Sequence, residues 1–385
     1  MKIALLSTYM HRGGAAVANE RLARALRALG YEVTEICARG NRVPFLAERL
    51  EIFVCNGFNR SELFKVSTGR FGQAVSSMPE VKGADVVVLG WVNQGFVTLA
   101  DVERIAAPVV WLMHDMWCFT GICHYAFECR RYEHRCGRCP FVSHYSCERD
   151  ISRSVWQRKR ELYGRKHIEF VAVSRWLADC AKRSELLRDA SVTVIPNMFD
   201  FESHPLNRTG EQCIAMGAAR LDDPIKGLPI AVDALNFLAE HRPDLAQRSP
   251  LLLFGGLRDP KALKSLRYPH RVLGRVDNTM EVMSRAKVVL SAAEYETFGL
   301  TLLEGLAAGA IPVTFGNSGQ AEVVRHLENG YIVASRSPLA MAKGIEWALT
   351  QSPLQPQALR SDAASRFSPE TVGRQWQTLL QNLCR

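Results

Sequence analysis

The sequence predicts an α/β protein built from two Rossmann-like, doubly wound domains that face a cleft. Short, uncharged, β-branched runs such as residues 86–89 and 287–290 are typical of buried parallel strands. Such runs alternate with segments of helical periodicity, and the alternation starts again after about residue 200. A chain of 385 residues is long enough for two domains. We therefore expect domains at 1–200 and 201–368, with a last helix over 369–385 that packs back onto the first.

The charge of the chain indicates which kinds of ligand or surface it can bind. The net charge is +9, which favours phosphorylated ligands or an anionic membrane face. Lys and Arg are dispersed, which argues against nucleic acid. No apolar segment approaches the roughly 20 residues of a membrane helix, and the apolar start of the chain is too short for a signal peptide. We expect a cytoplasmic protein, with peripheral contact at the inner membrane face as a further expectation.

The first domain opens with a strand, a glycine loop and a helix. Residues 2–8 form the strand, Gly13 and Gly14 lie in the loop, and residues 15–29 form the helix. This is a Rossmann-type unit without the full dinucleotide fingerprint. Residues 40–80 carry few clear signals.

A later strand, residues 108–113, ends in His114 and Asp115. Strand ends in doubly wound sheets face the ligand crevice, so His114 could bind or polarise a sugar there. The alternative is a histidine held in a structural hydrogen bond with Asp115.

Six cysteines fall between residues 118 and 147. Cys136 and Cys139 have the spacing of a zinc knuckle, and Cys123 and Cys129 could complete a tetrahedral structural site. The substitute ligands are His124, His134 and His144. The alternatives are packed thiols or one reversible disulfide.

In the second domain, Arg220 and Lys226 lie six residues apart around a predicted loop. Two cations there could clamp a diphosphate and stabilise charge on a leaving group. The alternative for either residue is a solvated surface charge.

The stretch from Ser291 to Val313, SAAEYETFGLTLLEGLAAGAIPV, predicts a strand end, a loop and a helix that ends at Gly309. The N–H groups at the helix start suit a phosphate, and Gly299 allows close approach of a ligand. Glu296 and Glu304 could accept hydroxyls at two points of one ligand, as a nucleotide sugar would require. The alternative is that the glutamates only complement the helix dipole.

This stretch resembles the signature of retaining glycosyltransferases of the GT-B fold, family 4. HDMWCFTGICHY, residues 114–125, resembles the colanic-acid-type and capsule-type members of that family. The resemblance implies that Glu296 and His114 lie at the donor sugar and Glu304 at the ribose. It implies catalytic roles for His114, Glu296, Arg220 and Lys226, the last two at the diphosphate. It further implies donor contacts from Gly13, Gly14, Phe298, Gly299 and Leu300, and acceptor contacts from Asp115, Thr120 and Gly121.

The expected reaction is transfer of a sugar from a UDP- or GDP-sugar to a saccharide acceptor, with retention. The acceptor is expected to be lipid-linked, as in cell-surface polysaccharide biosynthesis. The resemblance implies no catalytic metal. Two alternatives stay open, which are a GT-B relative with phosphorylase or epimerase chemistry and a non-catalytic, zinc-containing binding protein.

Overall fold

The computed structural model describes residues 1–385 except 11–12, 39, 61–62, 207–208, 352–353 and 384–385, and the side chains of 143–144. The chain forms two compact units, Met1–Pro196 with Gly373–Arg385, and Asn197–Val372. Each unit contains a six-stranded sheet with helices on both faces. The predicted fold class, two Rossmann-like α/β domains, is confirmed.

The sheet of unit 1 has the strand order β2-β1-β3-β4-β5-β6, and every pair is parallel. Its central strands are buried throughout because helices cover both faces. The strands are β1 (Lys2–Ser7), β2 (Glu32–Cys37), β3 (Val86–Leu89), β4 (Val109–Met113), β5 (Ile168–Ala172) and β6 (Val192–Val194).

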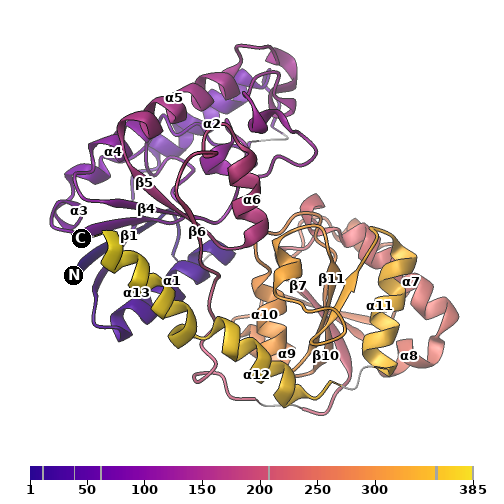
Figure 1. Ribbon diagram of the computed structural model, residues 1–385. Coiled ribbons are helices and arrows are strands. Elements are labelled where there is room, and N and C mark those ends of the chain that lie inside the picture. Colours follow the sequence, from indigo (N-terminus) through magenta and orange to yellow (C-terminus); the bar gives the residue numbers. More distant parts are fainter. Residues whose placement is uncertain (11–12, 39, 61–62, 207–208, 352–353, 384–385) are drawn as a thin grey trace. The chain divides into compact units, whose positions relative to one another are not determined.

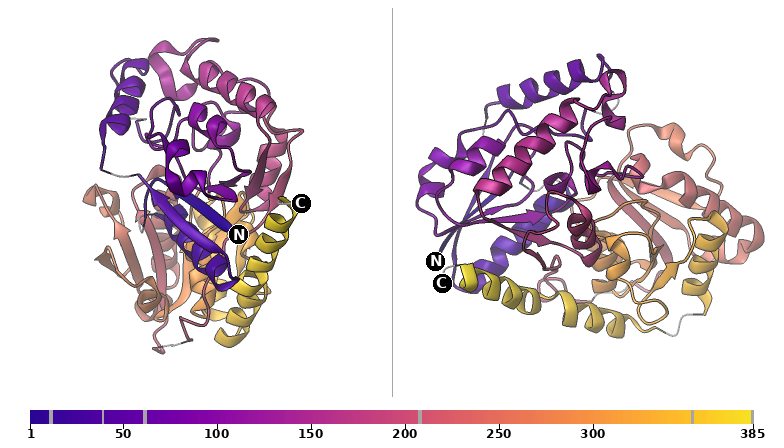
Figure 2. Two further views of the ribbon diagram at one scale, coloured as in Figure 1. Left: turned by 90° about the vertical axis from the view of Figure 1, so that its left-hand side faces the viewer. Right: turned by 45° about the horizontal axis from the view of Figure 1, so that its top comes forward.

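In unit 1, α1 and α13 lie on one face of this sheet, and α4 and α5 on the other (Figure 1). Gly373 of α13 sits against Leu29, where an added Cβ would be 3.2 Å from Leu29 Cδ1. The start of β1 and the last turns of α13 lie side by side in all three views (Figures 1 and 2). The helices are α1 (Gly14–Ala28), α2 (Val43–Cys55), α3 (Pro79–Lys82), α4 (Leu99–Arg104), α5 (Ile151–Arg165), α6 (Arg175–Arg183) and α13 (Pro369–Leu383).

The sheet of unit 2 has the order β12-β11-β10-β7-β8-β9 and is also parallel. In that unit α10 and α12 cover one face, and α7 and α11 the other (Figure 1). The strands are β7 (Cys213–Arg220), β8 (Leu251–Gly256), β9 (His270–Gly274), β10 (Ala286–Ser291), β11 (Ile311–Phe315) and β12 (Tyr331–Val333). The helices are α7 (Leu228–His241), α8 (Pro243–Arg248), α9 (Thr279–Met283), α10 (Leu300–Ala307), α11 (Pro338–Thr350) and α12 (Pro356–Phe367).

Both sheets reverse their winding direction once. In unit 1 the chain runs from β1 to β2 and then returns to place β3 on the other side of β1. In unit 2 it runs from β7 through β9 and then places β10 on the other side of β7. Ligands of doubly wound sheets bind outside the carboxyl ends of the strands at such a switch point. The loops after β1 and β3, and after β7 and β10, are therefore the places to examine.

No helix in the described part of the chain is both long enough and apolar enough to cross a bilayer. Residues 40–80, which carry few clear signals, contain α2 and the start of α3.

Candidate functional site

Two cations follow β7 at the switch point of unit 2. Arg220 is the last residue of β7, and its Nη2 lies 2.9 Å from Asp223 Oδ2. Lys226 ends a short 3-10 turn, and its Nζ donates to Glu296 Oε2 at 2.7 Å. The structure therefore brings Lys226 together with Glu296, which comes from the loop after β10.

Backbone contacts hold these two loops against each other. The N–H of Glu294 donates to the carbonyl of Ile225 at 2.8 Å. Gly227 has a φ of 65°, and a Cβ there would lie 2.0 Å from the carbonyl oxygen of Ala292. Only glycine fits this conformation and this contact without moving one of the loops. The pairing of Lys226 with Glu296 is thus fixed by the backbone on both sides.

Each cation at this point lies beside carboxylates, Arg220 beside Asp222 and Asp223, and Lys226 beside Glu296. Burial by itself lowers the pKa of Lys226, but the carboxylates of Glu296 and Asp223 outweigh burial and raise it, so the ammonium persists at neutral pH. The Nε of Arg220 is buried and makes no hydrogen bond to any described residue. The Arg220 side chain as a whole is 36% exposed, and Asp222 Oδ1 lies 3.9 Å from Nε, too far for a hydrogen bond. A phosphate oxygen would satisfy this Nε donor.

The helix after Glu296 begins at the same edge. Gly299 precedes α10 with a φ of 95°, and a Cβ there would lie 3.2 Å from the Cβ of Gln320. Phe298 is buried and packs edge-on against Phe367 at 5.5 Å between ring centroids. Its side chain therefore belongs to the core, and residues Phe298, Gly299 and Leu300 can offer a ligand their backbone N–H groups.

Glu304 lies one turn into α10 and is nearly buried. Its Oε2 accepts a hydrogen bond from the hydroxyl of Thr279 at 3.2 Å, and Thr279 is the first residue of α9. The carboxylate is therefore held in place by a neighbouring helix. A Glu that only complemented the helix dipole would not need such a partner.

In unit 1, His114 directly follows β4 and is held by Asn19 of α1. His114 Nε2 lies 2.8 Å from Asn19 Oδ1. Asn19 Nδ2 donates to the hydroxyl of Ser7 at 3.1 Å, so Oδ1 is the acceptor and the Nε2 of His114 carries the proton. Gly90 makes room for this arrangement, since a Cβ there would lie 2.4 Å from Asn19 Nδ2.

The environment keeps the His114 ring neutral. Burial lowers its pKa to about 4, although the negative charge of Asp115 opposes the shift. At neutral pH the ring is therefore an uncharged imidazole protonated on Nε2, which suits it to hydrogen bonding rather than to ion pairing.

Asp115 is engaged with partners other than His114. Its Oδ2 accepts from Trp91 Nε1 at 2.7 Å and lies 3.1 Å from His124 Nδ1. Its Oδ1 accepts from the backbone N–H of Trp117 at 2.8 Å. Despite burial, His124 and these hydrogen bonds lower the pKa of Asp115. The sequence left open a structural hydrogen bond between His114 and Asp115, and the structure instead shows one from His114 Nε2 to Asn19 Oδ1.

The loop after Asp115 is held by side chains at every carbonyl from Trp117 to Gly121. The buried Lys159 of α5 donates to Trp117 O, to Thr120 O at 3.1 Å and to Gly121 O at 3.0 Å. One turn further along α5, the hydroxyl of Tyr163 donates to Cys118 O at 2.7 Å. The hydroxyl of Ser184, directly after α6, donates to Phe119 O, also at 2.7 Å. The Lys159 Nζ also lies 3.7 Å from the centre of the Trp117 ring. Burial lowers the pKa of this amine to about 7, while the three carbonyls that accept its hydrogen bonds favour the ammonium.

This loop explains where two predicted acceptor residues lie. Thr120 is fully buried, and its hydroxyl donates to Cys123 O at 2.6 Å. Gly121 is also buried, and a Cβ there would lie 2.5 Å from the Ser152 carbonyl. Both residues are buried in this structure, and their acceptor role stays a prediction.

Gly13 and Gly14 lie at the start of α1. Gly13 has a φ of 87°, and a Cβ there would meet nothing within 4 Å. The preceding loop residues His11 and Arg12 lie outside the described residues.

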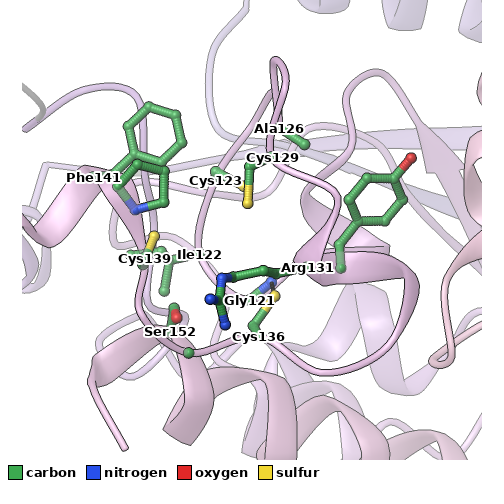
Figure 3. A pocket seen from close by; sticks show the side chains of 13 residues that line it. Gly121, Ile122, Cys123, Ala126, Cys129, Arg131, Cys136, Cys139, Phe141 and Ser152 are labelled. Carbon is green, nitrogen blue, oxygen red and sulfur yellow. Dashed lines mark hydrogen bonds between the residues drawn. The ribbon is translucent and has the colours of Figure 1, made fainter. Parts of the chain in front are cut away.

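Cys123, Cys129, Cys136 and Cys139 line one cavity of about 10 Å³ (Figure 3). Burial raises the pKa of Cys136 to about 12, against the hydrogen bond that its sulfur accepts from the Gly121 N–H at 3.1 Å. The described residues contain no group of three or more His, Cys, Asp and Glu arranged to hold a metal ion.

The substitute zinc ligands lie elsewhere. His124 pairs with Asp115, His134 is exposed, and the side chain of His144 is outside the described residues.

Several functional residues are not predicted by the sequence. Asn19 and Ser7 support His114 from the first strand and helix, and Lys159 supports the loop from 40 residues further along the chain. Lys159 carried one readable signal. It shares a face of α5 with the apolar Val155 and Leu162, where a solvated lysine is not expected.

We predict that His114 titrates near pH 4. The unfolded chain binds this proton near pH 6.5, so the neutral burial of His114 stabilises the fold above pH 6.5 by about 3 kcal/mol, and this stabilisation is lost as the pH falls from 6.5 towards 4. NMR titration of the histidine Cε1–H signals, with His114→Asn to assign the peak, measures the midpoint. A midpoint near 6.5 would contradict the buried environment.

We predict that Lys159→Met lowers the free energy of unfolding by at least about 3 kcal/mol. The methionine fills most of the space but leaves three buried carbonyls without a donor, each at a cost of about 1–3 kcal/mol. Urea unfolding measures the loss, with the exposed neighbour Arg160→Met as the control. A loss below about 1 kcal/mol would show that the ammonium is dispensable.

Sequence comparison matches most of each unit to a known family. Residues 12–203 match the family Glycosyltransferase Family 4, and residues 198–366 match Glycosyl transferases group 1. Among curated proteins, a phosphatidyl-myo-inositol mannosyltransferase of Mycobacterium leprae is 28% identical over 255 residues, 60% of this chain and 64% of that protein. An N-acetyl-alpha-D-glucosaminyl L-malate synthase of Bacillus anthracis is 27% identical over 128 residues, 32% of this chain and 34% of that protein. The matched regions thus span less than two thirds of these relatives.

Solved structures show the same fold at low identity. Anabaena Alr3699/HepE in complex with UDP-glucose has a TM-score of 0.66 and 16% identity, over 99% of this chain and all of that one. Sucrose-phosphate synthase from Thermosynechococcus elongatus has a TM-score of 0.67 and 15% identity, over 100% of this chain and 99% of that one. With the family matches to both units, these likenesses place the chain among the GT-B glycosyltransferases of the family 4 type.

Proposed function

We propose that this protein transfers a sugar from a nucleotide diphosphate sugar to an acceptor hydroxyl. The observation that carries the proposal is the charge arrangement at the switch point of unit 2. There Lys226 pairs with Glu296 at 2.7 Å, and the buried Nε of Arg220 makes no hydrogen bond within the part of the chain that the structure describes. A diphosphate would satisfy the Arg220 donor and share the Lys226 ammonium.

The roles of the individual groups follow from their chemistry. Breaking the bond between the sugar and the diphosphate builds negative charge on the leaving oxygen. Lys226, Arg220 and the N–H groups that begin α10 at Gly299 would stabilise that charge. Glu296, held beside Lys226, would accept hydroxyls of the donor sugar. Glu304, held by Thr279, would accept those of the ribose.

Unit 1 would contribute through His114. The neutral ring, fixed by Asn19, can exchange a hydrogen bond with a sugar hydroxyl without a change of charge. Asp115 supports the loop that follows rather than His114 itself. Gly13, at the start of α1, leaves space for a ligand to approach the backbone.

The donor, acceptor and stereochemistry are proposed from the relatives. Because Alr3699/HepE is named as a complex with UDP-glucose, UDP-sugars are the first donors to test, and GDP-sugars the second. The mycobacterial relative is a phosphatidyl-myo-inositol mannosyltransferase, which supports a lipid-linked acceptor, and the acceptor we propose is a lipid-linked saccharide. Resemblance of residues 114–125 to colanic-acid-type enzymes supports a role in cell-surface polysaccharide synthesis, at the cytoplasmic membrane face. The signature around Glu296 supports retention, which the anomeric proton coupling of the product would report.

We predict that Glu296→Ala lowers kcat at least about 100-fold, because the donor sugar and Lys226 both lose their partner. Turnover is measured as release of nucleoside diphosphate from UDP- and GDP-sugars that depends on a saccharide acceptor. The control is Glu294→Ala, which removes a carboxylate in the same loop that pairs with Arg336 at 3.5 Å. Unchanged turnover in Glu296→Ala would refute the assignment. Formation of sugar 1-phosphate from a saccharide and inorganic phosphate, without a nucleotide sugar, would indicate a phosphorylase.

We also propose a structural zinc ion held by Cys123, Cys129, Cys136 and Cys139. Three observations support it. All four cysteines line one cavity with room for a single water-sized atom. The Cys136 sulfur accepts a backbone N–H, as metal-bound thiolates often do. The knuckle between Cys136 and Cys139 turns through a left-handed Arg138, with a φ of 45°. Coordination would require the four sulfurs to close on a common centre, since the described residues do not form a ready set of metal ligands.

We expect about one zinc per chain in protein purified without added metal, measured by inductively coupled plasma mass spectrometry. Cys136→Ser should reduce this content strongly, and Cys147→Ser, at an exposed cysteine outside the cavity, should leave it unchanged. A zinc content near zero in the unaltered protein would show instead that these are packed thiols.

A further inference from the structure

Arginines line the solvent-facing side of α5 in unit 1, on the face of the sheet opposite α1 (Figure 1). Two adjoining hollows follow this helix, with volumes of about 820 and about 290 Å³, and Arg158 and Glu161 line both of them. We define the two hollows together as the α5 groove. The arginines that line it are Arg70, Arg135, Arg149, Arg153, Arg158 and Arg165.

The carboxylates of the α5 groove are engaged with only one of its arginines. Glu103 and Glu161 both pair with Arg165, at 3.3 and 3.8 Å. Glu148 pairs at 2.8 Å with Arg138, which lies outside the groove. The groove therefore keeps an excess of positive charge along most of its length.

The excess charge belongs to four of these arginines. Within the described residues, Arg135, Arg149 and Arg153 form no ion pair with a carboxylate. Burial, and after it the positive charge of Arg135, lowers the pKa of Arg153, so the two guanidinium groups repel each other. Arg158 is anchored through Nη2, which donates to Thr68 O at 3.0 Å, while its buried Nε makes no hydrogen bond to a described residue. An anion in the groove would relieve this repulsion and satisfy the Nε donor.

The neutral lining indicates which kind of anion fits the groove. Ser154 and Gln157 lie on α5 among the arginines, and Thr98 lines the smaller hollow, so hydroxyl and amide groups alternate with the cations. No aromatic side chain is among the described residues that line the groove, whereas the bases of single-stranded nucleic acid need such rings to stack on. A saccharide that carries acidic groups presents both hydroxyls and anions, which matches this lining.

The acidic residues of the groove argue against a surface of dense negative charge. The side chains of Glu148 and Glu161 are 63 and 48% exposed. An anionic lipid surface or a nucleic-acid duplex would bring its phosphates against these carboxylates, which repel them. A chain with widely spaced acidic groups can place each group at an arginine and avoid the glutamates.

The α5 groove borders the loop that follows His114. Ser152 directly precedes Arg153, and a Cβ on Gly121 of the loop would lie 2.5 Å from the Ser152 carbonyl oxygen. Gly69, which lines the smaller hollow, sits against Trp117 of the same loop, where a Cβ would lie 3.1 Å from the ring. A ligand in the groove therefore lies against the elements that hold this loop in place.

We propose that the α5 groove binds the acceptor saccharide, and that this saccharide carries acidic groups, either carboxylates or phosphate esters. The inference rests on the proposed function, which supplies the acceptor, and it adds the chemical class of that acceptor. Arg153 and Arg158 are separated by about 7.5 Å along the helix axis, so they would contact separate acidic groups of one chain. The groove holds the acceptor away from its reacting end, and it therefore contributes to affinity rather than to the chemical step.

The test is isothermal titration calorimetry of the full chain with an oligogalacturonate and with its uncharged methyl ester. We expect the acid to bind at least about 10-fold more tightly than the ester, and less tightly as salt is added, because salt screens the contacts. Arg149→Glu with Arg153→Glu should weaken binding of the acid at least about 10-fold. The matched control, Arg248→Glu with Arg267→Glu, makes the same change of charge at two exposed positions of unit 2 and should bind as the unaltered protein does.

Two further variants and one further ligand sharpen the result. Arg149→Gln with Arg153→Gln removes the charges without reversing them and should weaken binding in the same direction, which keeps the test valid if the reversed variant fails to fold. A phosphorylated mannan oligosaccharide that binds more tightly than the oligogalacturonate would identify the acidic groups as phosphate esters. Glu296→Ala should bind the acid unchanged, so a failure of the proposed catalysis and a failure of the α5 groove are seen separately.

Three results would overturn the proposal. The first is equal binding of the acid and its methyl ester. The second is undiminished binding of the acid by the variant with Arg149→Glu and Arg153→Glu. The third is tighter binding, lost in that variant, of oligothymidylate, polyglutamate or phosphatidylglycerol vesicles, which would make the occupant a nucleic acid, an acidic protein or a lipid surface.

Discussion

The parallel arrangement of the strands is the constraint on which both units depend. In each sheet the carboxyl ends of all the strands lie at the same edge, so the loops that carry the polar residues meet at that edge. The reversal of winding between β7 and β10 then separates two neighbouring loops just enough to place Lys226 against Glu296. In unit 1 the corresponding edge gathers Ser7, Asn19 and His114 from three separate elements. The sites follow from topology first and from side-chain chemistry second.

Many of the strands and turns could be predicted because a few neighbouring residues determine each of them. The apolar runs that form β3, β4 and β10 are short and uncharged, so burial on both faces is the natural interpretation. The turn at Gly299 and the end of α10 before Gly309 follow from the need for left-handed backbone. The pairing of Lys226 with Glu296 is less local, since 70 residues separate them, and the two were predicted individually as ligands without their mutual contact.

Other features could not be predicted because they depend on partners far apart in the chain. The sequence allowed a bond between His114 and its neighbour Asp115, but the fold delivers Asn19 to His114 and His124 to Asp115. Thr120 and Gly121 looked accessible as loop residues, yet Lys159, Tyr163 and Ser184 bind the carbonyls around them and draw the loop inward. Helix α2 could not be predicted because it buries Glu48 and Arg49 while Leu46 and Leu50 face solvent, the reverse of the usual amphipathic pattern.

The close contact of Gly227 with Ala292 has a consequence for the energetics of ligand capture. With no room for a side chain between them, the loop that carries Lys226 and the loop that carries Glu296 behave as one rigid clamp. Loops that are already ordered lose little conformational entropy when a ligand binds. A larger part of the free energy of each contact with the ligand then appears as binding affinity. The same rigidity limits adaptation, because a bulkier ligand cannot spread the two loops apart. The absence of a side chain at Gly227 thus sets the spacing of the two loops, and with it the size of ligand that they accept.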